Sequence, residues 1–183
     1  MRKQRSTVIT LITVICAFYL WELINPEIMG ELSLQRWEYL TFSNEWYRLF
    51  TVALLHDSSS TIPYHLAFNM FALHSLGTPI EAMMGKAKFL AIFFFSLLTG
   101  SIASALFLQG ASIGASGAVF GLFGAVLAIG RNFGGEVKGT IIIILANFAI
   151  GFRIGGVDWR AHLGGLVGGF VITKALLVLN ASK

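Results

Sequence analysis

Long apolar runs separated by short polar stretches dominate this chain. An isolated strand would leave its backbone polar groups unpaired in lipid, so each run is interpreted as a helix. Most approach the roughly 20 residues that a helix needs to cross a hydrocarbon core about 30 Å thick. The pattern predicts an all-α membrane protein with six transmembrane helices in one domain over residues 1–183. The runs are 7–24, 63–80, 88–108, 115–130, 138–153 and 161–180.

The fourth run is short for a membrane span. At a rise of about 1.5 Å per residue it covers only about 24 Å, so one end is expected to stop inside the membrane. The preceding segment, residues 109–114, is loop-like and rich in small residues. Irregular backbone at that depth is tolerated only where protein buries it or water reaches it. An aqueous cavity is therefore expected near the start of the fourth helix.

The connection over residues 26–62 mixes aromatic and charged side chains, including Trp37, Trp46, Tyr47 and Arg48. It is too polar to span a membrane and too apolar to stand free in water. Trp, Tyr and Arg favour the headgroup layer of a bilayer. We expect a structured interfacial insert in the outer leaflet.

Composition supports lipid as the main solvent. The chain is 56% hydrophobic and 12% charged, whereas soluble domains carry roughly 25% charged residues. Its formal net charge of +4 reflects scarce acidic residues and gives no indication of nucleic-acid binding. The single cysteine, Cys16, excludes an intrachain disulfide. The end of the first run lacks a small-x-small cleavage pattern, so this run is interpreted as a retained span.

The basic residues give an orientation. With the N-terminus inside, most of the 13 Lys and Arg residues fall on the inner side and only Arg36, Arg48, Arg153 and Arg160 fall outside. This distribution obeys the positive-inside rule and predicts that both termini are cytoplasmic. The inner group comprises Arg2, Lys3, Arg5, Lys86, Lys88, Arg131, Lys138, Lys174 and Lys183.

Two residues carry the candidate chemistry. Ser116 lies in Gly114-Ala115-Ser116-Gly117, where the fourth helix begins. Without a partner, Ser116 is better interpreted as a packing residue or an N-cap than as a nucleophile, because small residues are common where membrane helices approach closely. His162, near the start of the sixth helix, is ionisable inside a span, which favours a functional role over a simple bond to a neighbouring carbonyl.

Topology places Ser116 and His162 at the same membrane level, because the fourth and sixth helices both run from outside to inside. Glycines spaced four apart on both helices allow their axes to approach closely. These are Gly117 and Gly121 on one helix, and the pairs Gly164/Gly168 and Gly165/Gly169 on the other. A serine hydroxyl becomes a useful nucleophile when a base takes its proton. No intramembrane Asp or Glu is well placed to orient His162, so a dyad is favoured over a triad.

Candidate oxyanion donors come from two places. His65 and Asn69 share a face of the second helix, near its outer end; the alternative is that they only hydrogen-bond between helices. The backbone N–H groups of Ala115 and Ser116 lie at the positive end of the fourth helix dipole. Donors aimed at a developing oxyanion are worth several kcal/mol in a dry site. His74 faces away from this pair and is interpreted as structural.

Taken together, these segments resemble a rhomboid intramembrane serine protease over about residues 46–170, and they follow one another in the order found in that family. The resemblance rests on Tyr47 with Arg48, on residues 53–56, 65–70 and 77–81, and on the motifs around Ser116 and His162. It implies a six-helix rhomboid-like bundle with no cofactor and no metal. It also implies cleavage of transmembrane protein substrates near the outer face, with Ser116 as nucleophile and His162 as base. Gly114, Gly117, Phe120 and Arg48 are expected to support the site.

The chain departs from the family pattern at three places. Tyr47 stands where Trp is usual, residues 57–60 look inserted, and Phe120 replaces a Tyr that often packs on the catalytic histidine. Phe keeps the ring face and loses the hydroxyl, and no reacting group is removed, so activity is expected to survive.

Two alternatives remain beside a protease. A catalytically inactive relative would bind or remodel membrane proteins, although such relatives typically lack the serine or the histidine. A channel or transporter would place charged residues deep in several spans, whereas here the deep polar residues cluster near one face. The short cytosolic tails suggest a bacterial plasma membrane.

Overall fold

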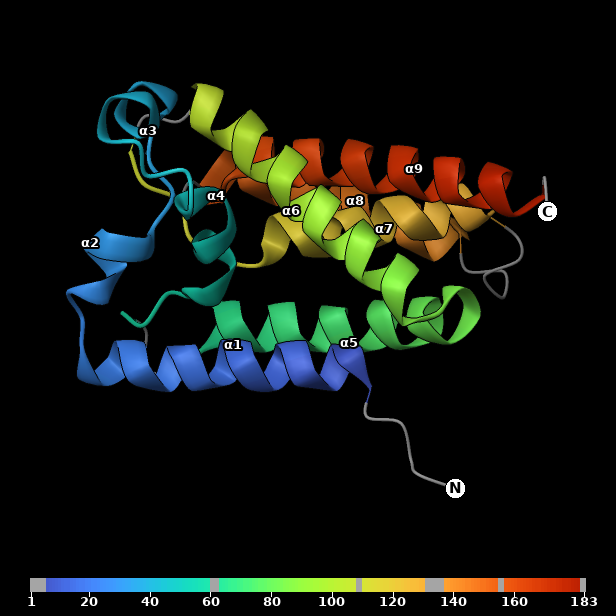
Figure 1. The fold of residues 1–183 in the computed structure, drawn as a ribbon, viewed down its shortest axis with the longest axis horizontal. Coiled ribbons are helices and arrows are strands. Elements are labelled where there is room, and N and C mark those ends of the chain that lie inside the picture. Colours follow the sequence, from blue (N-terminus) through green and yellow to red (C-terminus); the bar gives the residue numbers. More distant parts are fainter. Residues whose placement is uncertain (1–5, 60–62, 108–109, 131–136, 155–156, 182–183) are drawn as a thin grey trace.

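The computed structural model describes residues 6–59, 63–107, 110–130, 137–154 and 157–181, and these ranges are helical apart from their connections. Figure 1 shows the helices as an elongated bundle with a cluster of short helices at one end. Their bounds are α1 Thr7–Ile24, α2 Ile28–Leu32, α3 Trp37–Ser43, α4 Arg48–Thr51, the 3-10 helix η1 Val52–Leu54, α5 Tyr64–Met84, α6 Lys86–Phe107, α7 Ser116–Ile129, α8 Val137–Ile154 and α9 Trp159–Ala181.

All six apolar runs are helices, as predicted, and their ends differ from the predicted ends by a few residues. Three of them, α1, α6 and Trp159–Asn180 within α9, are long and apolar enough to cross a membrane by length and composition. The apolar helix α7 has only 14 residues, which at about 1.5 Å per residue is shorter than a full span. This confirms that the fourth run is short.

Helix α7 lies at the centre of the bundle, and almost every residue from Gly117 to Ile129 is buried. Glycines set how closely α9 approaches it. A Cβ atom on Gly165 would lie 1.9 Å from the carbonyl oxygen of Gly117, and one on Gly169 would lie 2.0 Å from that of Gly121. The close approach predicted from the glycine spacing is confirmed, and it brings the first turns of α7 and α9 together.

Helices α1 and α5 lie side by side along one flank of the bundle (Figure 1). Near the start of α1, the Glu81 carboxylate of α5 accepts hydrogen bonds from the Ser6 hydroxyl (2.7 Å) and from the backbone N–H groups of Thr7 (2.8 Å) and Val8 (3.2 Å). The first N–H groups of a helix lack partners within it, so Glu81 caps α1 from a neighbouring helix.

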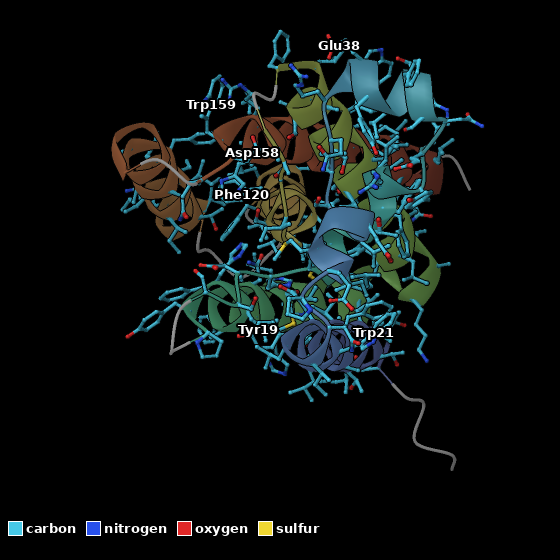
Figure 2. All side chains as sticks on the ribbon, turned by 90° about the vertical axis from the view of Figure 1, so that its left-hand side faces the viewer. Tyr19, Trp21, Glu38, Phe120, Asp158 and Trp159 are labelled. Atoms are coloured by element: carbon cyan, nitrogen blue, oxygen red, sulfur yellow. The ribbon has the colours of Figure 1, made fainter. Side chains whose placement is uncertain are left out.

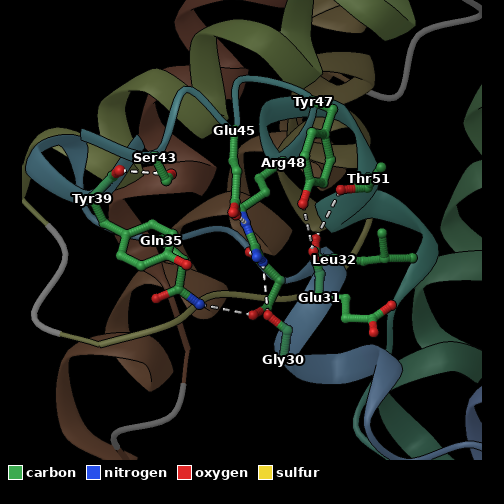
Figure 3. A network of polar contacts seen from close by, with 11 residues as sticks. Gly30, Glu31, Leu32, Gln35, Tyr39, Ser43, Glu45, Tyr47, Arg48 and Thr51 are labelled. Carbon is green, nitrogen blue, oxygen red and sulfur yellow. Dashed lines mark hydrogen bonds and ion pairs between the residues drawn. The ribbon is translucent and has the colours of Figure 1, made fainter. Parts of the chain in front are cut away.

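The short helices α2, α3 and α4 gather at the end of the bundle opposite to where α1 begins and α9 ends (Figure 1). Several of their aromatic side chains are exposed, most of all Phe42 at 94%. Inside the cluster, Arg48 is 4% exposed. It donates to the carbonyls of Gly30 and Ser33, both at 2.9 Å, and pairs with Glu45 (Figure 3). Residues 26–59 of the connection are therefore structured, as predicted, and residues 60–62 lie outside the described residues.

Candidate active site

Ser116 and His162 meet where α7 and α9 begin. The Nε2 atom of His162 lies 2.9 Å from the Ser116 hydroxyl oxygen, which is hydrogen-bond distance. His162 is 6% exposed, and Ser116 is the first residue of α7. The predicted juxtaposition of the two side chains is confirmed. An imidazole at this distance is able to take the hydroxyl proton if its Nε2 is unprotonated.

The His162 ring is stacked on Phe120, one turn after Ser116 along α7. The ring centroids lie 4.0 Å apart, and the planes differ by 9°. Phe120 is itself held by edge contacts with Phe123 and Phe148. The aromatic cluster therefore restricts the tilt of the imidazole, and Phe120 lies where a supporting residue was expected.

Asp158 fixes the start of α9. Its carboxylate accepts the backbone N–H of Ala161 at 3.2 Å and the hydroxyl proton of Ser104 on α6, and its backbone carbonyl accepts the N–H of His162 at 3.2 Å. Figure 2 looks at this end of the molecule, with Asp158 and Phe120 labelled. An Asp just before a helix is a strong N-cap signal, and Asp158, directly before α9, carries this signal in the sequence.

The imidazole of His162 takes no carboxylate partner in the described ranges. Its Nδ1 atom is buried without a hydrogen bond there, because the Asp158 carboxylate is directed at Ser104 and Ala161. Among the described residues, Ser116 is thus the hydrogen-bond partner of the imidazole, and the Asp158 carboxylate makes its bonds to Ser104 and Ala161 instead.

Backbone contacts hold the loop before Ser116. Leu34 and Ser112 exchange two N–H···O bonds of 2.9 and 3.0 Å, and Gly114 donates its N–H to Val52 at 2.8 Å. Arg48 anchors residues Gly30 and Ser33 just before Leu34. The predicted supporting residue Arg48 therefore lies away from Ser116 and reaches the serine loop through this backbone bridge.

His65 lies directly against the serine loop. Gly114 has φ +113°, and a Cβ there would lie 2.7 Å from Cε1 and 2.8 Å from Nε2 of His65. Only glycine suits both the conformation and the space. Asn69 is buried, and its amide donates to the His65 carbonyl at 2.8 Å. Of the two predicted side-chain donors, His65 approaches the loop, while Asn69 uses one N–H on its own helix.

Two further buried groups adjoin His65. His56 is fully buried, with its ring centroid 5.0 Å from that of His65, and Glu22 accepts the backbone N–H of His56 at 3.1 Å. Burial, with a smaller repulsion from His65, lowers the pKa of His56 to about 3. Hydrogen bonds from the Ser59 hydroxyl and N–H lower the pKa of Asp57.

No candidate metal centre is formed by the residues that the structure describes: nowhere among them do three or more His, Cys, Asp or Glu side chains gather closely enough to hold an ion. The polar groups around Ser116 and His162 instead suit proton transfer and hydrogen bonding.

Comparisons with known proteins show what the chain is similar to. The family model of the Rhomboid domain matches residues 43–179. The chain is 43% identical to the "Rhomboid protease GluP" of Bacillus subtilis over 142 residues, which are 75% of this chain and 27% of that protein. It is 37% identical over 138 residues to the "Putative rhomboid protease YdcA" of the same organism, which are 72% of this chain and 67% of that protein. It is also 37% identical to the "RHOMBOID-like protein 6, mitochondrial" of Arabidopsis thaliana, over 84% of this chain and 51% of that protein.

Proposed function

Because the chain belongs to the rhomboid family of integral membrane proteins, we propose that it is an intramembrane serine endopeptidase with Ser116 as nucleophile and His162 as base. The observation that carries this proposal is the 2.9 Å distance between Ser116 Oγ and His162 Nε2. The two atoms come from the first turns of two helices, α7 and α9, that pack closely together.

The chemistry proceeds in two halves. Ser116 Oγ attacks the scissile carbonyl carbon while His162 Nε2 takes the hydroxyl proton. The tetrahedral intermediate collapses to an ester on Ser116, and His162 gives the proton to the departing amine. Water then attacks the ester while His162 takes a proton from it. The ester bond breaks, the acid product leaves, and His162 returns the proton to Ser116. Phe120 keeps the imidazole ring in one plane through both halves.

The negative charge on the carbonyl oxygen needs donors along this path. The backbone N–H groups of Ala115 and Ser116 at the start of α7, the His65 ring and the Asn69 amide supply them in our proposal. A helix start leaves N–H groups without intrahelical partners, and its dipole favours negative charge. His65 is the better placed of the two side chains, since it touches Gly114.

We further propose six spans, with both termini in the cytoplasm and the catalytic pair near the outer face. In support, α1 begins and α9 ends at the same end of the bundle (Figure 1), as an even number of crossings requires. The site lies at the other end, where α7 and α9 begin. Transmembrane segments of other proteins are the proposed substrates, and a bacterial plasma membrane is the proposed location.

Reconstituted protein tests the proposal. The purified chain in liposomes is incubated with a panel of single-span substrates, beside a Ser116→Ala variant of matched thermal stability. Cleavage by wild type alone supports the protease. A folded wild-type protein that cleaves none of the panel favours the non-catalytic, substrate-binding alternative.

A further inference from the structure

We propose that Glu22 of α1 is a positioning residue for the oxyanion site, acting through the backbone of His56 and Asp57 on the His65 ring. The inference deepens the proposed function and rests on it for its catalytic part. No sequence motif connects Glu22 with the site.

Glu22 is an unusual residue for its place. It is 1% exposed on a helix otherwise suited to lipid, and burying a carboxylate is costly unless it is paired. Its Oε2 atom accepts the His56 N–H at 3.1 Å, while Oε1 has no hydrogen bond within the described ranges. A buried polar group kept at such a cost suggests a use beyond stability.

The next backbone group along the loop reaches the candidate site. Asp57 donates its N–H to Nδ1 of His65 at 3.3 Å. Glu22 therefore holds one N–H, and the adjacent N–H holds the imidazole. On the far side, the Asp57 carboxylate accepts the N–H and the hydroxyl proton of Ser59 at 2.9 and 2.6 Å. The short segment 56–59 is thus fixed on both sides of the bond to His65.

This bond selects the His65 tautomer. A ring nitrogen that accepts an N–H bond is unprotonated, so a neutral imidazole must carry its proton on the other nitrogen. For His65 that nitrogen is Nε2, on the edge of the ring next to Gly114. With segment 56–59 bonded to Nδ1, the His65 ring therefore presents its Nε2–H donor toward the serine loop at Gly114. Outer contacts of this kind are known to set the tautomer and direction of functional histidines.

Loss of the Glu22 acceptor should release the segment and let His65 adopt both tautomers. With the proton on Nδ1, the Nε2 lone pair would face the developing oxyanion and repel it. Because the oxyanion forms only along the reaction path, the loss should appear in kcat and leave KM nearly unchanged.

The test compares Glu22→Leu, Glu22→Gln and Glu81→Leu in the full-length protein. Glutamine keeps an acceptor oxygen for the His56 N–H, so Glu22→Gln should keep the wild-type His65 tautomer and turnover. Glu81 provides the matched control, since its carboxylate also accepts backbone N–H bonds, from Thr7 and Val8, but lies near the end of α5 opposite to His65. Nitrogen-15 NMR of labelled histidine resolves the tautomers directly, because the chain has only four histidines.

Wild type, Glu22→Gln and Glu81→Leu should show His65 protonated at Nε2, and Glu22→Leu should show a mixture. Glu22→Leu should lower kcat on the order of tenfold, as partial loss of one donor would, and should add no loss in a His65→Ala background. If Glu22→Leu does not fold, Asp57→Pro tests the next link, because proline deletes the Asp57 N–H that donates to Nδ1 of His65.

An unchanged His65 tautomer in a folded Glu22→Leu or Asp57→Pro protein overturns the positioning role. Equal losses in Glu22→Leu and Glu81→Leu, or a multiplicative loss with His65→Ala, also overturn it. A wild-type protein that cleaves no substrate overturns the proposed function instead, and the NMR measurement distinguishes the two failures because it needs no cleavage.

Discussion

The imidazole of His162 lies flat against the phenyl ring of Phe120, with 4.0 Å between centroids, while its Nε2 points at Ser116. Phe120→Ala should remove this support and lower turnover by about tenfold or more, since a misplaced reacting group can cost up to about a hundredfold. Phe120→Tyr keeps the ring face and should stay near wild type.

Phe89→Ala is the control for this prediction, because Phe89 is also a buried phenyl ring and has no ring contact with Phe120 or His162 in the described structure. Turnover is measured beside the melting temperature for all three variants. A Phe120→Ala protein that cleaves normally would show that the stacking has no role in catalysis.

The proposed oxyanion donors predict a graded series. His65→Ala and Asn69→Ala should each slow cleavage without abolishing it, because backbone N–H groups at the start of α7 remain. Removing one such donor in a soluble protease costs about 10²–10³ in rate, and sharing among donors should make the cost smaller here.

Within this series His65→Ala should cost more than Asn69→Ala, since one Asn69 N–H is used on the His65 carbonyl. Asn69→Asp should be worse than Asn69→Ala, because it sets a negative charge against a negative charge. Steady-state cleavage of one quenched substrate in liposomes measures all three, and wild-type turnover by Asn69→Asp would remove Asn69 from the oxyanion site.

Close packing of α7 and α9 predicts that Gly165→Ala is severe. The added methyl would lie 1.9 Å from the Gly117 carbonyl oxygen, so the helices must separate and the serine must move away from the histidine. Overpacking of this kind typically costs about 1–3 kcal/mol. Gly30→Ala is the control, because a Cβ there meets nothing within 4 Å. Equal stability and turnover of the two variants would contradict this packing account.

Burial of His56 predicts acid sensitivity. The pKa of His56 falls from 6.5 to about 3 in the folded protein. Between these two values, His56 therefore binds a proton in the unfolded chain and not in the folded protein. The contribution to stability is complete above about pH 6.5 and is lost progressively as the pH falls toward 3, by at most about 1.4 kcal/mol per pH unit.

Unfolding in detergent from pH 7 to 4 measures this effect, with His56→Phe as the comparison. The variant should show a shallower loss of stability with falling pH. Parallel curves for the two proteins would mean that His56 does not titrate on unfolding.

The helices and the meeting of Ser116 with His162 were predictable, because hydrophobic runs mark helices and alternating direction places their ends. The roles of Glu22 and Asp158 were not predicted. The role of Glu22 depends on a hydrogen bond that the distant His56 N–H donates to it. The contact of Asp158 with α6 likewise depends on a bond donated by the distant Ser104 hydroxyl, although its local bond with Ala161 follows an N-cap pattern. The bridge between Leu34 and Ser112 is similar, since two short segments without any strand pattern meet only when the bundle forms.

Labelling of Ser116 with a fluorophosphonate probe tests the central claim most directly, because the probe reacts only with an activated serine. The account predicts one modified residue, Ser116, in wild type, and loss of labelling in Ser116→Ala and His162→Ala. Residues that act as one unit show strongly non-additive losses, so cleavage by the double variant should be little worse than by either single variant. An unlabelled Ser116 in folded wild-type protein, or full labelling of His162→Ala, would contradict the claim that these two residues form a catalytic dyad.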